Sequence, residues 1–239
     1  MKQLLFSFTL ALLAFGLQSC VYVDSQDDIP PRGEGTRTYD FRNFDELEMG
    51  HAFRVNVKAG SSFSVTAKGE LNDLDDLNLF VEQGKLVARY NNSWRNHREP
   101  MYIDITMPDI QKVDFSGAVK AKLVGFENLP GLEFELSGAS KVEFEGSGRD
   151  FNFDLSGASQ LFLFGQGKYL YGDLSGASEL DAFDLITQES DLELSGASTA
   201  RVCVSEFLKV DASGASNVRY KGNPNVDKKT SGGSTVRQE

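Results

Sequence analysis

The tetrapeptide Ser-Gly-Ala-Ser, or a near copy of it, recurs seven times in the second half of the chain, at intervals of 18 to 21 residues. The copies begin at Ser116, Ser137, Ser156, Ser175, Ser195, Ser213 and Ser231. A unit of about twenty residues is too short to enclose a core, so each unit must bury its apolar face against the next one. The repeat therefore predicts a solenoid.

Apolar residues alternate on both sides of each tetrapeptide. The positions one residue before the first Ser and five residues after it are apolar in nearly every copy: Phe115, Leu136, Leu155, Leu174, Leu194 and Ala212 before it, and Ala121, Val142, Leu161, Leu180, Ala200, Val218 and Val236 after it. This period of two indicates two strands per coil, with the tetrapeptide as the corner between them.

A third, looser side of each coil is expected around Leu129, Leu170, Ile186, Leu208 and Val226. Two strands and one loose side favour an all-β fold, a single-stranded parallel β-helix with irregular N-terminal coils. Right-handed crossovers are strongly preferred, so the helix is expected to be right-handed. The period of two also predicts that the second Ser of each corner is buried and hydrogen-bonded, with Val119 taking that place in the first copy.

The N-terminal half is strand-like but less regular. Strands are expected at residues 53–57, 63–67, 86–90 and 102–106, and one or two helical turns at residues 71–77. We interpret these segments as early coils that cap the regular stack within the same domain.

The first residues resemble a bacterial lipoprotein signal. Lys2 precedes an apolar run from Leu4 to Leu17, which is shorter than the roughly twenty residues that span a bilayer. Leu17-Gln18-Ser19-Cys20 then resembles a lipobox, in which Cys20 is the lipidated first residue of the mature protein. We therefore expect a signal peptide at residues 1–19, a lipidated Cys20 and flexible tether at residues 20–35, and the β-helix domain at residues 36–239.

Charge and cysteine content narrow the function. The chain carries 35 acidic and 24 basic residues, so nucleic acid is not an expected partner. Lipidation of Cys20 would leave Cys203 without an intrachain disulfide partner. The acidic segment Ser25-Gln26-Asp27-Asp28 after the lipid cysteine resembles short signals that send some lipoproteins to the outer face of the outer membrane; a plain acidic spacer is the alternative.

Together, the lipobox, the acidic tether, the strand-rich opening half and the repeated corners resemble the putative auto-transporter adhesin, head GIN domain family. The resemblance covers residues 36–239. It implies a right-handed β-helical fold in a secreted or lipid-anchored bacterial protein and a function in adhesion. The family brings no catalytic residue set.

Six acidic residues stand two positions before the first Ser of successive corners: Asp114, Glu135, Asp154, Asp173, Glu193 and Asp211. They lie between two inward positions, so we expect an exposed acidic ladder. Three roles are open: a solvated face that opposes lateral association of sheets, a site for a divalent cation, or a surface for a basic partner.

Two further surfaces are candidates for binding. The polar loop at residues 91–100 could present Trp94, Arg95 and Arg98 to a ligand, or the Trp could fold back onto the cap. Phe162, Phe164 and Phe183 would form an aromatic patch if they face outward, and otherwise another part of the chain covers them.

An enzyme is not expected. Only His51 and His97 are present, and no pattern of nucleophile, base and orienting group or of zinc ligands is visible. No cofactor is expected. The sequence predicts a lipid-anchored protein of the outer membrane that binds a glycan or protein at the cell surface. A purely structural envelope protein and a β-helical polysaccharide-active enzyme are the alternatives, and the sequence does not fix the oligomeric state.

Overall fold

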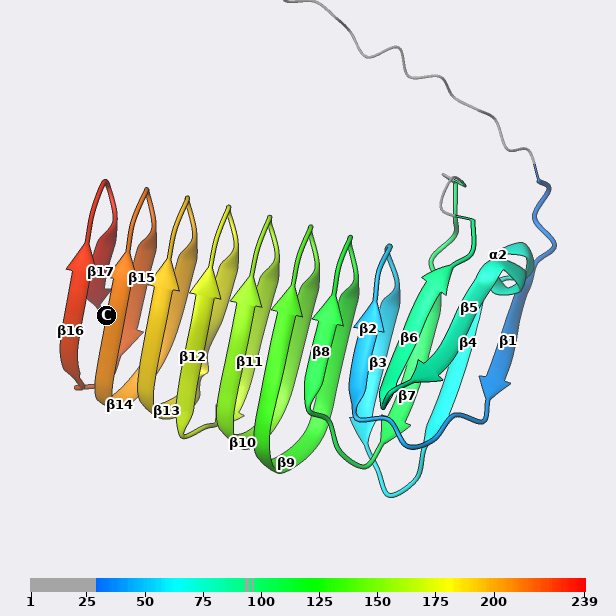
Figure 1. Cartoon of the computed structure of the whole chain (residues 1–239), viewed down its shortest axis with the longest axis horizontal. Coiled ribbons are helices and arrows are strands. Elements are labelled where there is room, and N and C mark those ends of the chain that lie inside the picture. Colours follow the sequence, from blue (N-terminus) through cyan, green and yellow to red (C-terminus); the bar gives the residue numbers. More distant parts are fainter. Residues whose placement is uncertain (1–28, 93–94, 96) are drawn as a thin grey trace, which may run out of the picture. The chain divides into compact units, whose positions relative to one another are not determined.

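The computed structural model describes residues 29–92, 95 and 97–239, and contacts divide the chain into residues 1–30 and 31–239. The second unit contains all the strands and the helix named below (Figure 1). Its first half comprises β1 (Glu34–Tyr39), β2 (Glu46–Met49), β3 (Arg54–Ala59), β4 (Ser64–Glu70), α2 (Leu71–Asp76), β5 (Leu77–Glu82), β6 (Lys85–Tyr90), β7 (Tyr102–Met107) and β8 (Lys112–Phe115). Its second half comprises β9 (Lys120–Leu136), β10 (Lys141–Leu155), β11 (Gln160–Gln166), β12 (Tyr169–Leu174), β13 (Glu179–Leu194), β14 (Thr199–Ala212), β15 (Asn217–Lys221), β16 (Asn225–Thr230) and β17 (Thr235–Gln238).

The regular part is a right-handed β-solenoid, as the sequence predicts. In Figure 1 the chain climbs the near layer, crosses a corner, descends the far layer and advances by one coil. We call the layer that runs into the corners sheet A and the layer that leaves them sheet B. The long strands β9, β10, β13 and β14 each begin in sheet B and continue through a bend into sheet A, and successive coils pair in parallel register.

The core lies between the two sheets. Phe115, Leu136, Leu155, Leu174, Leu194 and Ala212 pair in one inward column of sheet A, and all are buried. Full burial of one Leu or Phe side chain stabilises the fold by about 1.5–3 kcal/mol. Because each column repeats along the stack, most of the stabilisation comes from contacts between neighbouring coils.

The corners stack backbone on backbone. Gly117, Gly138, Gly157, Gly176, Gly196, Gly214 and Gly232 all have φ between 68° and 72°. From the second of these corners onward, the following residue donates its N–H to the carbonyl oxygen of the glycine in the preceding coil, as Ala177 does to Gly157 at 2.7 Å. A Cβ on Gly176 would lie 2.6 Å from that same oxygen. The corner therefore requires glycine both for its left-handed backbone and for the close approach of the next coil.

The second Ser of each corner is buried, as predicted, in every copy except the last, where Ser234 is only partly covered. The hydroxyl of Ser198 donates to the carbonyl oxygen of Ser195 at 2.6 Å, and that of Ser178 donates to Leu155 at 3.3 Å in the preceding coil. Val119 is fully buried in the equivalent place. These hydroxyls satisfy their hydrogen-bonding capacity inside the core.

The third side is a bend and not a separate row of residues. Leu170, Leu208 and Val226 belong to one column of sheet A, whose other members are Leu132, Phe151 and Ser190. Leu129 pairs instead with Gly148, and Ile186, which is 58% exposed, pairs with Gln166 and Cys203. The grouping of these five residues into one side was therefore wrong, because shifts of register within the bend offset the strands.

The N-terminal strands do not stack in sequence order. The coil of β2 and β3 pairs with the coil of β6 and β7 on one side. On its other side it pairs with β8 and β9, where the regular stack continues. The β2–β3 connection, Gly50-His51-Ala52-Phe53, is a further corner that lacks the Ser-Gly-Ala-Ser sequence. In it His51 adopts φ 63°, at the position that Gly117 occupies in the next corner. The coil of β2 and β3, which comes first in the sequence, therefore lies between the coil of β6 and β7 and the coil that begins with β8.

The N-terminal end of the stack is capped. β5 pairs antiparallel with β6, β4 pairs antiparallel with β7, and β1 in turn pairs antiparallel with β4. The short helix α2 fills the end, with Leu74 fully buried. The Glu70 carboxylate caps it by accepting the N–H groups of Asn72 at 2.7 Å and Asp73 at 3.3 Å.

In the last coil, polar residues take two inward positions of sheet A that are apolar in the preceding coils. Val210 is buried in sheet A, and its neighbour in the last coil is Lys228. Thr230 likewise follows Ala212 in the adjoining inward column. A charged side chain at an inward position opposes further pairing of an edge strand. No helix among the described residues is long and apolar enough to cross a membrane.

Candidate ligand-binding groove

The six acidic residues form an aligned row on the outside of sheet A. Parallel pairing joins Asp114, Glu135, Asp154, Asp173, Glu193 and Asp211 on successive strands, and the last four are exposed. Glu48 of β2 extends the row at one end, and Lys229 of β16 ends it at the other. Glu48 could not be recognised as a member of this row from the sequence, because its corner lacks the Ser-Gly-Ala-Ser signature.

Lysine side chains neutralise the N-terminal part of this ladder. Lys112 Nζ lies 2.6 Å from Glu135 Oε1 and 3.0 Å from Glu133 Oε1, and Lys85 Nζ lies 2.9 Å from Glu48 Oε2. The hydrogen bond from Lys112 lowers the pKa of Glu135. Burial raises the pKa of Asp114, and the neighbouring charges of Glu135 and Glu48 add to that effect.

The ladder does not assemble a metal site. Among the described residues, no group of three or more His, Cys, Asp and Glu side chains could hold a metal ion. Single carboxylates on successive strands also lack the loop carbonyls that calcium sites use. A cation-binding role of the ladder stays a prediction that no geometry supports.

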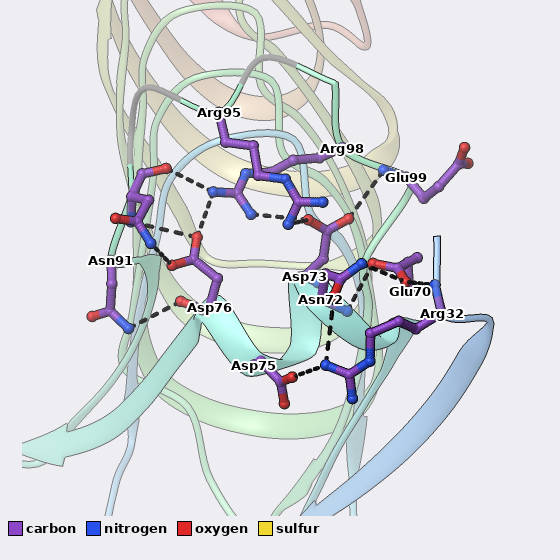
Figure 2. A network of polar contacts seen from close by, with 11 residues as sticks. Arg32, Glu70, Asn72, Asp73, Asp75, Asp76, Asn91, Arg95, Arg98 and Glu99 are labelled. Carbon is purple, nitrogen blue, oxygen red and sulfur yellow. Dashed lines mark hydrogen bonds and ion pairs between the residues drawn. The ribbon is translucent and has the colours of Figure 1, made fainter. Parts of the chain in front are cut away.

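Two of the three residues predicted in the binding loop have structural partners, and Trp94 lies outside the described residues. Arg95 Nη1 lies 3.1 Å from Asp73 Oδ1, and Arg98 Nη1 lies 3.0 Å from the same oxygen, with Arg98 Nη2 at 2.5 Å from Asp76 (Figure 2). The side chains of both arginines are about nine-tenths buried, and the guanidinium of Arg98 stacks 3.7 Å from the Tyr90 ring centroid. This network attaches the loop to α2.

The three predicted aromatic residues have different environments. Phe183 is buried between Arg201 and Lys221, each 4.2 Å from its ring centroid. Phe162 is partly covered, with Lys141 Nζ 4.6 Å from its ring centroid. Only Phe164 is exposed, at 38%. Other parts of the chain therefore cover Phe183 and partly cover Phe162, through cationic side chains from neighbouring coils.

A groove runs across the N-terminal half of sheet B, on the face opposite to the acidic ladder. It consists of two adjoining cavities of about 330 and 320 Å³, which share Lys122 and Glu143. The first is lined by Tyr102 of β7, Arg54 of β3, and Lys120 and Lys141 of β9 and β10, and the second ends at Phe164 of β11.

An exposed aromatic ring stands at each end of this groove. Tyr102 is 44% exposed at one end and Phe164 is 38% exposed at the other. Large exposed aromatic rings offer flat apolar surface, and the Tyr hydroxyl adds a polar group. The basic side chains lie between the two rings. Two carboxylates, Glu143 and Glu145, also line the groove, so positive charges outnumber negative ones there by four to two. No histidine or cysteine is among its lining residues.

The groove is not predictable from the sequence pattern alone. Its members come from segments as distant as Arg54 and Phe164, and the non-sequential stacking of β7, β3 and β9 brings them together. The signal that was available is the pair Lys120 and Lys141, which occupy the same position after two successive corners.

These features define a class of protein: a parallel β-solenoid with an open groove on the outer face of one sheet and an acidic row on the outer face of the other. A family model matches residues 43–224, and the chain belongs to that family, described as "Putative auto-transporter adhesin, head GIN domain". The recognition of the family from sequence is confirmed. Its description names adhesion and no enzymatic activity.

Solved structures share the fold. A putative adhesin from Bacteroides fragilis superimposes with a TM-score of 0.77 at 16% identity, covering 88% of this chain and 99% of the other. A protein from Parabacteroides distasonis described as a putative lipid binding protein gives a TM-score of 0.72 at 16% identity, covering 87% and 98%. At this identity the likeness concerns the fold alone. No curated protein matches the chain.

Proposed function

We propose that this protein is a lipid-anchored component of the cell envelope that binds a ligand at the cell surface and catalyses no reaction. The observation that carries this proposal is the groove on sheet B, where exposed aromatic rings and basic side chains line an open surface with no nucleophile and base placed together. The family's description as an adhesin supports the same role.

The anchor is proposed from the sequence. The lipobox at Leu17-Gln18-Ser19-Cys20 supports lipidation of Cys20, and the acidic residues that follow support export to the outer membrane with the domain facing outward. A lipid anchor would hold the groove near the cell surface, where a ligand on another cell or matrix can reach it.

Metabolic labelling with an alkyne fatty acid tests the anchor. The wild-type protein should take up the label and sediment with membranes, and Cys20→Ala should lose the label. Cys203→Ala is the matched control, since it removes the other cysteine of the chain and should keep the label. Equal labelling of wild type and Cys20→Ala would contradict lipidation at this residue.

Protease treatment of intact cells tests display. Removal of the domain from intact cells supports a surface position, and protection until the outer membrane is permeabilised contradicts it. Binding of the purified lipoprotein to a panel of glycans and matrix proteins then tests ligand binding. Failure to bind any of them would favour a purely structural role, and turnover of a glycan would support an enzyme.

A further inference from the structure

We propose that the groove on sheet B binds a linear anionic glycan, with its basic side chains contacting carboxylate or sulfate groups and its end rings stacking on sugar rings. This inference rests on the proposed function and names the chemical class of the ligand. It goes beyond adhesion as such, because it places the contact on one face of one sheet.

The basic residues form a continuous set. Arg54, Lys120 and Lys141 pair with one another on successive strands, so their Cα atoms follow at intervals of about 4.8 Å. Lys122 lies two residues beyond Lys120 and points to the same outer face. The groove thus holds four positive charges beside the two negative charges of Glu143 and Glu145, which gives it a local positive excess in a protein whose net charge is −11.

Most of these charges have no protein partner. In the described part of the chain, Lys141 is ion-paired, with its Nζ 2.9 Å from Glu143 Oε1, whereas no carboxylate lies within ion-pair distance of Arg54, Lys120 or Lys122. Two like charges about 5 Å apart in water repel by about 1 kcal/mol before salt screening. An anionic ligand would relieve this repulsion and gain charge-assisted hydrogen bonds.

The spacing of the rings fits an extended chain. Tyr102 pairs with Arg54 at one end, and Phe164 of β11 lies at the other, so the groove spans four strand intervals, about 19 Å. Aromatic rings stack on the apolar faces of sugars, while the cations between them would meet the anionic substituents. A ligand with charge alone would leave both rings without a contact.

Other macromolecular ligands fit less well. The groove lies over strands that are paired on both sides, so an extended peptide finds no free edge to which it can add as a strand. A second copy of the chain would bring its own negative net charge close to that of the first. These two alternatives are outcomes of the test below.

Binding of the full-length lipoprotein, in detergent, to heparin and to polygalacturonate tests the proposal, with neutral dextran and polyglutamate as comparisons. Both anionic glycans should bind more tightly than dextran, and added salt should weaken the binding of both. The double variant Lys120→Gln/Lys141→Gln should weaken binding about tenfold or more. Lys228→Gln/Lys229→Gln removes two exposed lysines of the last coil and serves as the matched control, which should bind as the wild type does.

The rings provide a second readout. Tyr102→Ala should weaken binding to the anionic glycans, and Tyr102→Phe should restore most of it, because the ring is kept. Binding of dextran or polyglutamate as tight as that of the glycans would overturn the proposal, as would equal losses in the groove and control variants. Sedimentation that reveals groove-dependent self-association without glycan binding would also overturn it.

The same experiment separates the two levels of inference. If the protein binds a neutral glycan or a matrix protein independently of Lys120 and Lys141, the anionic-glycan inference fails and surface binding stands. If the wild type binds none of the glycans or matrix proteins, both fail.

Discussion

Gly117 lies directly against the backbone of His51, so that a Cβ on Gly117 would come within 2.6 Å of the His51 carbonyl oxygen. The same contact repeats from glycine to glycine through the seven corners that follow one another in the sequence. The spacing of the coils is therefore set at the corners by atoms of the main chain, and side chains adjust around it.

Gly176→Ala should be strongly destabilising. The added Cβ would lie 2.6 Å from the Gly157 carbonyl oxygen, and φ 72° is unfavourable for alanine. We expect a loss of about 2–4 kcal/mol in the free energy of unfolding, measured by urea denaturation. Gly233→Ala is the matched control: it has no positive φ, and its Cβ would lie 3.7 Å from the nearest atom. Equal losses for the two variants would contradict the stacking argument.

Ser198→Ala should cost about 1 kcal/mol of stability, since it removes a buried hydroxyl that donates to the Ser195 carbonyl oxygen at 2.6 Å. Ser195→Ala changes an exposed hydroxyl of the same corner and keeps that carbonyl, so its thermal midpoint should stay near that of the wild type. A larger loss for Ser195→Ala would show that the assignment of inward and outward serines is wrong.

Asp73→Ala should destabilise the N-terminal cap by about 3 kcal/mol, because it leaves the guanidinium groups of Arg95 and Arg98 without one of their buried carboxylates. Asp75→Ala removes an exposed partner of Arg32 and Arg37 and should have a smaller effect. Hydrogen exchange of the residues around α2 in each variant provides the measurement. Unchanged protection in Asp73→Ala would contradict a structural role for the network.

Asp114→Asn should stabilise the protein near neutral pH. The raised pKa of Asp114 means that the folded state holds the proton more tightly than the unfolded state, so stability falls as pH rises through that pKa. Removing the charge should gain about 0.5–1 kcal/mol near pH 7 and nothing near pH 3, where Asp114 is protonated. Urea denaturation at both pH values checks this expectation, and destabilisation near pH 7 would contradict it.

The repeated corner made the solenoid predictable because stacking requires the same residue types at the same place in each coil. Where stacking does not require them, the signature is lost. His51 stands in a glycine position, and the coil that pairs with it on the other side, made of β6 and β7, has no Ser-Gly-Ala-Ser sequence between its strands.

The candidate groove was less predictable for a related reason. Lys120 and Lys141 stand in register after consecutive corners, but Arg54 and Tyr102 join them only through the order in which β7, β3 and β9 stack. That order depends on long-range pairing, which a local pattern of apolar residues does not encode. The burial of Arg95 and Arg98 was also hidden, since their partners Asp73 and Asp76 lie in a helix too short to predict faces from its period.

The two ends of the solenoid have a consequence for how such proteins can change in length. Capping strands and α2 close one end, and at the other end Lys228 and Thr230 replace apolar residues at two inward positions of sheet A. Extra coils are therefore best accommodated as in-frame insertions between existing corners, where both new surfaces meet matching neighbours. Duplication of an internal unit would lengthen the molecule, whereas a unit packed against the last coil would meet Lys228 and Thr230 at inward positions.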